Sequence, residues 1–266
     1  MDTVQRAKMA LWKRFREVTG YPHDPDGYVG HPARNLIQGV SPEMIKEDYL
    51  QGSGSEWNTK FRAIHSSAAL AANSFGRWKT DPAALAIQGL SGFGPPALEA
   101  KCPTGLKGTP PNLDVLLQSS TDVIGIESKL LEPLTQKKSK FSASYTRTNL
   151  PRCEEQWWAL LEDTKRRSPG YFDAAQIIKH YLGLRNSFQD GRRIHLLYIY
   201  WKPLNARDFP EYESHQQEIQ RFTSFVAGSE VDFVAMDYLA LWRHWRDETL
   251  LTPHVRNLMT RYAVEI

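Results

Sequence analysis

Cysteine is scarce in this sequence of 266 residues, which contains only Cys102 and Cys153. Neither belongs to a CxxC pair or to a Cys/His set with the spacing of a structural zinc site. A disulfide scaffold is equally unsupported, because such scaffolds use many cysteines in a short chain. We therefore expect two free thiols in a reducing compartment.

Long apolar stretches are also missing. No run approaches the roughly 20 residues that a membrane-spanning helix needs, and residues 1–20 lack the apolar core of a signal peptide. The sequence thus predicts a cytoplasmic protein without a membrane partner.

Three common catalytic motifs are absent too. The chain has no P-loop and no HExxH, and the stretch GLSGFG (89–94) has Phe93 where a GxSxG nucleophile elbow needs glycine. The chemistries that depend on these motifs are therefore not predicted.

Charge of one sign is not in large excess. Lys and Arg total 33 against 30 Asp and Glu, which leaves a net charge of +3, and hydrophobic residues make up 41% of the chain. This composition is typical of a folded globular protein and not of a disordered one. The slight basic balance is compatible with nucleic-acid binding but does not argue for it, so the distribution of charge matters more than its total.

The N-terminal part of the chain is expected to be helical. Apolar residues recur with helical spacing over residues 3–18, and the pair Ser41-Pro42 is typical of a helix start. We interpret residues 1–50 as an N-terminal helical extension and residues 51–266 as the main domain.

The main domain is predicted to open with a long helix over residues 57–78, after the turn-like stretch GSGSE (52–56). Three strands separated by turn-rich segments then predict an antiparallel meander, and the pattern continues as helices alternating with two more strands. The fold class that follows is α/β, with a central mixed sheet flanked by helices. The five expected strands span residues 96–102, 112–118, 122–132, 193–201 and 230–238.

Charged residues interrupt two of these apolar strands. The second strand contains Asp114, and the third contains Glu127 and Lys129, which lie two apart and share one face of the strand. Charges on a strand that packs against a core cost free energy unless they are paired or bind a metal. Two carboxylates on adjacent strands suit a divalent cation such as Mg²⁺, and a lysine beside them can act on an attacking water or on a phosphate. The set therefore favours metal-assisted phosphodiester hydrolysis.

The stretch PPNLDVLL…IGIESKLLE (110–132) resembles the PD-(D/E)XK nuclease superfamily, which has a restriction-endonuclease-like core. The match assigns the metal to Asp114, Glu127 and the Ser128 carbonyl, and catalysis to Asp114, Glu127 and Lys129. One departure is that Pro111 does not directly precede Asp114, although that proline is often missing in the superfamily. The resemblance implies a Mg²⁺-dependent nuclease, with Mn²⁺ as a substitute.

Three further residues are candidates for auxiliary roles. The superfamily often has a glutamate on the helix before the meander, a role that Glu56 matches; the alternative is an acid in a first helical turn, favoured by the helix dipole. Glu99 heads a second E-x-K triplet on the first strand and is the rival third carboxylate. Gln176 matches the polar residue that the superfamily often places on the helix after the motif; the alternative is a surface glutamine.

A basic segment with aromatic residues follows the third strand. These side chains could grip phosphates and stack on a base, and the alternative is a solvated loop. The candidate nucleic-acid-binding residues are Lys137, Lys138, Lys140, Tyr145 and Arg147.

The function expected from these features is a divalent-metal-dependent endonuclease acting on nucleic acid, with DNA as the expected substrate. The competing hypothesis is a non-catalytic nucleic-acid-binding or interaction module on the same fold. The sequence leaves open whether the substrate is DNA or RNA, whether cleavage is sequence-specific, and whether the protein forms a homodimer.

Overall fold

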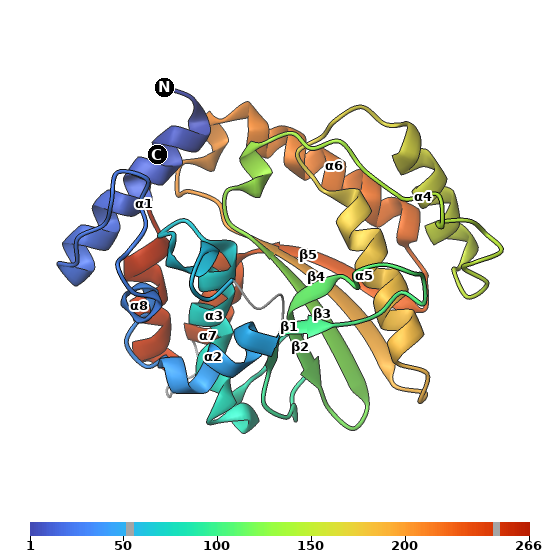
Figure 1. The fold of residues 1–266 in the computed structure, drawn as a ribbon, viewed down its shortest axis with the longest axis horizontal. Helices are drawn as coiled ribbons and strands as arrows, with labels where there is room; N and C mark the ends of the chain where they lie inside the picture. The colour runs from blue at the N-terminus through green and yellow to red at the C-terminus, as the bar shows by residue number, and fades with distance from the viewer. Residues whose placement is uncertain (52–55, 247–250) are drawn as a thin grey trace.

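The structure is a computed structural model that describes residues 1–51, 56–246 and 251–266. Its centre is a mixed sheet (Figure 1). The sheet has five strands in the order β1-β2-β3-β4-β5. The β1/β2 and β2/β3 pairs are antiparallel, and the β3/β4 and β4/β5 pairs are parallel. The predicted α/β class with a meander followed by alternating helices and strands is confirmed. The strands are β1 (Ala97–Lys101), β2 (Asn112–Gln118), β3 (Asp122–Lys129), β4 (Arg193–Tyr200) and β5 (Val231–Asp237).

Helices cover both faces of this sheet (Figure 1). One face packs against α4 (Glu155–Arg166), α5 (Ala174–Ser187) and α6 (Pro210–Val226) around a core that includes Trp157 and Phe222. All eight residues of β3 are buried between the two layers, which explains the apolar run at residues 123–126 in the middle of the strand.

The other face packs against helices from both ends of the chain. Leu11 of α1, Leu70 of α3 and Leu258 of α8 share one core with Ile126 of β3. The core thus joins segments on both sides of residue 50, and the proposed boundary between an extension and a main domain stays a prediction. The helices of this layer are α1 (Thr3–Thr19), α2 (Pro42–Gln51), α3 (Ser67–Phe75), α7 (Tyr238–Arg246) and α8 (Thr252–Tyr262).

The long helix predicted over residues 57–78 is wrong in its first half. Residues 56–59 form a turn, and α3 begins only at Ser67, where the Ser66 side chain accepts a 3.2 Å hydrogen bond from Ala69 N. Before that point the backbone pairs with a distant loop, through hydrogen bonds from Val29 N to Arg62 O and from Ile64 N to Gly27 O, both 2.9 Å. These long-range bonds exclude a helix there. Glu56 is therefore not in a first helical turn.

Other differences are smaller. The third strand ends at Lys129 and not at residue 132, because a 3-10 turn with Pro133 follows it. Helix α8 was not predicted. The stretch 52–55, with the expected cap Ser55, lies outside the described residues. Within the described parts of the chain, none of the helices has the length and apolarity to span a membrane.

Glycines let α5 approach the sheet closely. A Cβ at Gly125, in the middle of β3, would lie 2.8 Å from the Leu184 side chain, and one at Gly183 of α5 would lie 2.3 Å from the Cys102 carbonyl oxygen. Larger residues at either position would push α5 outward. This close packing sets α5 directly over the charged residues at the end of β3.

Candidate metal and catalytic site

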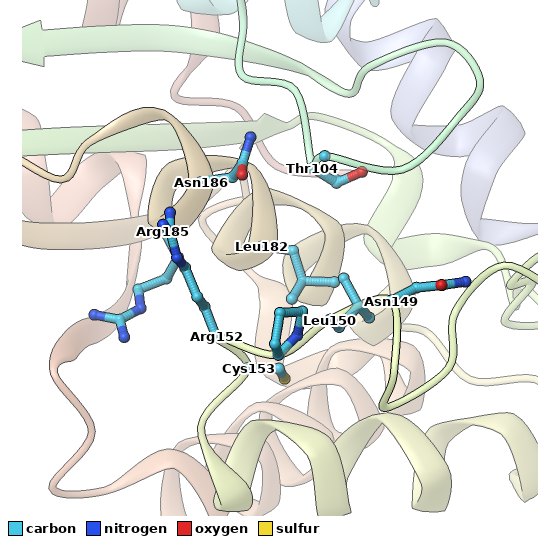
Figure 2. A pocket seen from close by; sticks show the side chains of 10 residues that line it. Thr104, Asn149, Leu150, Arg152, Cys153, Leu182, Arg185 and Asn186 are labelled. Carbon is cyan, nitrogen blue, oxygen red and sulfur yellow. The ribbon is translucent and has the colours of Figure 1, made fainter.

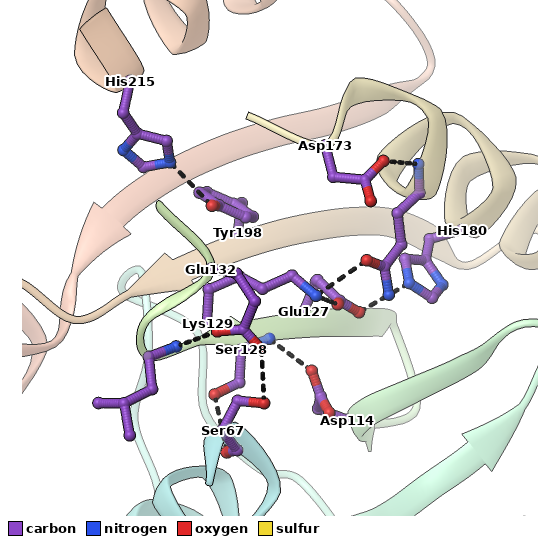
Figure 3. Close-up of polar contacts among 12 residues, drawn as sticks. Ser67, Asp114, Glu127, Ser128, Lys129, Glu132, Asp173, His180, Tyr198 and His215 are labelled. Carbon is purple, nitrogen blue, oxygen red and sulfur yellow. Dashed lines mark hydrogen bonds and ion pairs between the residues drawn. The ribbon is translucent and has the colours of Figure 1, made fainter. Parts of the chain in front are cut away.

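Glu127 and Lys129 lie at the carboxyl end of β3, on the face that α5 covers (Figure 3). They are 1% and 6% exposed, and the Lys129 ammonium donates a short hydrogen bond to Glu127 Oε1. The same ammonium donates to Gln176 Oε1 on α5 at 2.8 Å. The structure therefore brings Gln176 of α5 to Glu127 and Lys129 of β3.

His180 is a neighbour of the site that the sequence did not assign to it. It is fully buried on α5, and its Nε2 lies 2.7 Å from Glu127 Oε2 (Figure 3). This close contact lacks hydrogen-bond geometry, since neither ring nitrogen has a hydrogen-bond partner among the described residues. The spacing was an available signal, because His180 lies four residues after Gln176 and thus on the same face of the helix.

Asp114 lies where the β1/β2 ladder is interrupted. Leu98 pairs with Val115 and Ala100 pairs with Leu113, so that Asp114 and Glu99 stand opposite each other between these pairs. The Oδ2 atom of Asp114 accepts a 2.6 Å hydrogen bond from Ser128 N (Figure 3). This bond holds the aspartate against β3, beside the strand positions of Glu127 and Lys129.

Ser128 itself points to the opposite face from Glu127 and Lys129. Its hydroxyl forms a 2.6 Å hydrogen bond with Tyr238 OH and lies 3.4 Å from the Ser67 carbonyl oxygen. Only the main-chain atoms of Ser128 can therefore contribute to the site, which is compatible with the expected binding of a metal by its carbonyl.

Glu132 is a further carboxylate that the sequence did not assign to the site. It accepts hydrogen bonds from Leu130 N at 2.8 Å and from Ser67 Oγ at 3.0 Å. These bonds shape the turn after β3 and tie it to the start of α3 (Figure 3).

Electrostatics differ sharply between the two proposed metal-binding acids. Burial raises the pKa of Glu127, but Lys129 and His180 outweigh it and hold that pKa at about 2. Burial and the nearby charge of Glu127 raise the pKa of Asp114 well above its usual range. Glu127 is therefore held in its ionised form, whereas a cation that binds beside Asp114 would lower the raised pKa of that acid.

Lys129 is held in its charged form. Burial lowers its pKa, but the carboxylates of Glu127, Glu132 and Asp114 together raise it above the ordinary lysine value. A lysine with a raised pKa is a cation and not a base near neutral pH.

Glu99 is the strained member of the acidic group. It is 8% exposed and has a φ of 52°, in the left-handed region that non-glycine residues rarely adopt. Burial, and next the charge of Glu56, raise its pKa to about 7, while Asn112 donates a 3.2 Å hydrogen bond to its Oε2. Glu56 is thus close enough to act on Glu99, although it does so from a turn and not from a helix.

The two carboxylates of Asp114 and Glu127 fit Mg²⁺ better than a metal that takes all its ligands from the protein. Across residues 1–51, 56–246 and 251–266 no group of three or more His, Cys, Asp and Glu side chains could hold a metal ion. Mg²⁺, however, usually takes one or two carboxylates and completes its shell with water and substrate phosphate. Asp114 and Glu127 supply that number. The Oε1 atom of Glu127 accepts from the Lys129 ammonium, and its Oε2 atom lies 2.7 Å from His180 Nε2.

The basic segment after β3 is exposed at its lysines and anchored at its end. Lys137, Lys138 and Lys140 are exposed, and the Lys137 backbone pairs with Gly170. Tyr145 is half-buried, and Arg147 binds the Cys153 carbonyl at 2.6 Å and Glu155 at 2.8 Å. The lysines remain candidates for phosphate contacts, whereas Arg147 also has a structural task.

A family model described as Restriction Endonuclease associating with ARP matches residues 9–263 of the chain. Neither the search of curated proteins nor the search of solved structures produced a match. The matched range contains the whole sheet and every residue of the site described above.

Proposed function

The chain belongs to a restriction-endonuclease-like family, and from this premise we propose that it is a divalent-metal-dependent nuclease of the PD-(D/E)XK type that hydrolyses phosphodiester bonds in DNA. The observation that carries the proposal is the buried group at the end of β3, in which Lys129 binds Glu127 and Gln176 beside Asp114. Desolvation makes a buried group of charges costly in free energy. Its presence at this place therefore favours a functional role over a purely structural one.

Asp114, Glu127 and the Ser128 carbonyl would hold the metal. A bound Mg²⁺ supplies a polarised phosphate and a more acidic water. The two acids differ in their electrostatics, since the pKa of Glu127 is lowered to about 2 whereas the pKa of Asp114 is raised, and a bound cation would lower it.

Lys129 would act as a cation. Its raised pKa favours holding the attacking water and offsetting charge on the phosphate over taking a proton from the water. Gln176 accepts a hydrogen bond from the Lys129 ammonium on the side of α5, and so limits the orientations that the ammonium can adopt. Glu99 and Glu56 would serve as auxiliary acids at the edge of the site.

The family description also names an association with ARP, and we include a protein partner of that description in the proposal. The non-catalytic alternative keeps the fold and the partner but has no use for a metal. Calorimetric titration with Mg²⁺ and Mn²⁺ separates the two, since only the nuclease is expected to bind them at Asp114 and Glu127.

The direct test is cleavage by the purified protein. Plasmid DNA, linear duplex DNA, single-stranded DNA and RNA are each incubated with and without Mg²⁺, beside the Lys129→Ala variant as the matched control for contaminating nucleases. Mg²⁺-dependent cleavage that the variant lacks supports the proposal. Equal cleavage by both proteins, or none on any substrate, contradicts it.

A further inference from the structure

A cavity of about 270 Å³ lies where the segment after β3 meets the loop before α5. Its floor is a two-way backbone pairing, with hydrogen bonds of 2.7 Å from Lys137 N to Gly170 O and 3.1 Å from Gly170 N to Lys137 O. Thr164 and Arg167 at the end of α4 and Arg221 of α6 contribute to its walls. Three separate segments of the chain thus meet around one cavity.

Two hydrogen-bond donors on this cavity have no acceptor among the residues that the structure describes. Thr164 is 1% exposed, and its hydroxyl has no hydrogen-bond partner in the described part of the chain. The same holds for Nε of Arg167. Because buried donors are nearly always paired in folded proteins, two unpaired ones in one place indicate a ligand that accepts hydrogen bonds.

The charges around the cavity favour an anion. Asp163 forms an ion pair with Arg167 and lies 3.6 Å from Arg221, and Glu218 is engaged by a 2.7 Å hydrogen bond from Phe172 N. The Lys137 ammonium, by contrast, has no carboxylate partner within the described residues. The positive charge of Lys137 is therefore free to pair with an anionic ligand.

A short stretch of chain connects the cavity with the end of β3. Three residues after Gly170, Asp173 caps α5 by accepting a 3.0 Å hydrogen bond from Gln176 N (Figure 3). The side chain of Gln176 in turn binds Lys129. A nucleic-acid strand at the catalytic group could thus place a neighbouring phosphate in the cavity.

We propose that this cavity, which we call the phosphate pocket, binds a phosphate group of the nucleic-acid substrate through Lys137, Arg167 and Thr164. The inference rests on the proposed nuclease function. Lysine, arginine and a hydroxyl are the groups that proteins use to bind phosphate oxygens. A terminal phosphate and an internal phosphodiester share this chemistry.

The test is binding without cleavage. The affinity of the protein for a short fluorescent oligodeoxynucleotide is measured by anisotropy in EDTA over a range of salt. Lys137→Gln should raise Kd about tenfold at low salt and reduce the salt slope by about one, because one phosphate contact is lost. Because the Lys137 side chain is exposed, the variant should fold as the wild type does, and circular dichroism checks this.

The matched control is Arg152→Gln. Arg152 is exposed and lines a different cavity of about 320 Å³, shown in Figure 2, beside the C-terminal end of α5. The two cavities are separated by most of α5, about 18 Å from Ala174 to Asn186 at 1.5 Å per residue. Arg152→Gln removes the same charge and should change Kd less than about twofold. Equal losses from both variants would overturn the phosphate pocket.

A second variant tests the buried hydroxyl. Thr164→Val keeps the side-chain shape and removes an unpaired donor, so stability should be unchanged or higher while oligonucleotide binding weakens. Comparing oligonucleotides with and without a 5′-phosphate distinguishes the two sources of the phosphate. If neither Lys137→Gln nor Thr164→Val weakens binding, the inference fails even where the wild-type protein cleaves DNA. A wild-type protein that binds the oligonucleotide but does not cleave DNA would instead count against the proposed function.

Discussion

The backbone N–H of Ser128 donates a 2.6 Å hydrogen bond to Oδ2 of Asp114. This bond crosses from β3 to β2, and its donor lies between Glu127 and Lys129 in the sequence. It holds the aspartate at the point where the β1/β2 ladder is interrupted. It leaves Oδ1 of Asp114 for another partner. The site is thus assembled by two strands, and each strand has a distinct part in it.

Removing this aspartate should remove the metal. Asp114→Ala is expected to abolish both Mg²⁺ binding and cleavage, because Glu127 alone is a single carboxylate that is already paired with Lys129. Calorimetry with Mg²⁺ and a cleavage assay measure the two effects. Asp232→Ala, on the exposed part of β5, is the control and should change neither. Metal binding that survives in Asp114→Ala would contradict the assignment.

Chelation should stop the reaction. Cleavage is expected to need Mg²⁺ or Mn²⁺ and to cease in EDTA, and Ca²⁺ is expected to bind without supporting turnover, because its looser coordination places the water poorly. Rates with each ion, and after adding Mg²⁺ back, provide the measurement. Undiminished cleavage in excess chelator would contradict the metal-dependent mechanism.

Lys129→Met should abolish cleavage and also destabilise the fold. It leaves Glu127, 1% exposed, without its cationic partner, and breaking a buried pair in this way costs about 3–5 kcal/mol. Urea denaturation in EDTA measures the loss, and the double variant Lys129→Met/Glu127→Gln should recover part of it. If Lys129→Met keeps near wild-type turnover, the catalytic pair lies elsewhere, and Glu99 with Lys101 becomes the next candidate.

Glu99 should make stability depend on pH. Its pKa is about 7 in the folded protein against 4.5 for an ordinary glutamate, so between these values the folded state holds a proton that the unfolded state has lost. Stability from this group is therefore present below pH 4.5 and is lost as pH rises through 7, by up to about 3 kcal/mol.

Urea denaturation in EDTA at pH 4.5 and pH 8 checks this expectation. Glu99→Gln should be more stable than the wild type at pH 8 and similar to it at pH 4.5. The control Glu17→Gln changes a half-exposed glutamate of α1 and should leave the pH dependence unaltered. A wild type whose pH dependence matches that of Glu99→Gln would show that Glu99 is not the titrating group.

Glu56, the second auxiliary acid, has a test of its own. Its charge helps to raise the pKa of Glu99, so Glu56→Gln should lower that pKa and narrow the pH window in which stability falls. If it also serves the reaction, turnover should fall by about 10²-fold. A shift of the stability profile with unchanged turnover would limit Glu56 to tuning Glu99.

The sequence alone determined the sheet and the spacing of its central charges. Alternation with a period of two is a local property, so the positions of Glu127 and Lys129 on one face and of Ser128 on the other follow from their order in β3. The turn-rich separators likewise predict the β1-β2-β3 meander. The chemical role of these residues remains a prediction that rests on their pattern and on the family.

Only the tertiary structure decided what surrounds that hairpin. The start of α3 at Ser67 depends on backbone bonds to residues 27–29, which lie more than 30 positions earlier in the chain. The contact of His180 with Glu127, and the meeting of Glu99 with Asp114, depend on how closely α5 and β1 pack against the hairpin. Such contacts join residues far apart in sequence, and their geometry is set by packing of the whole core, which no local pattern contains.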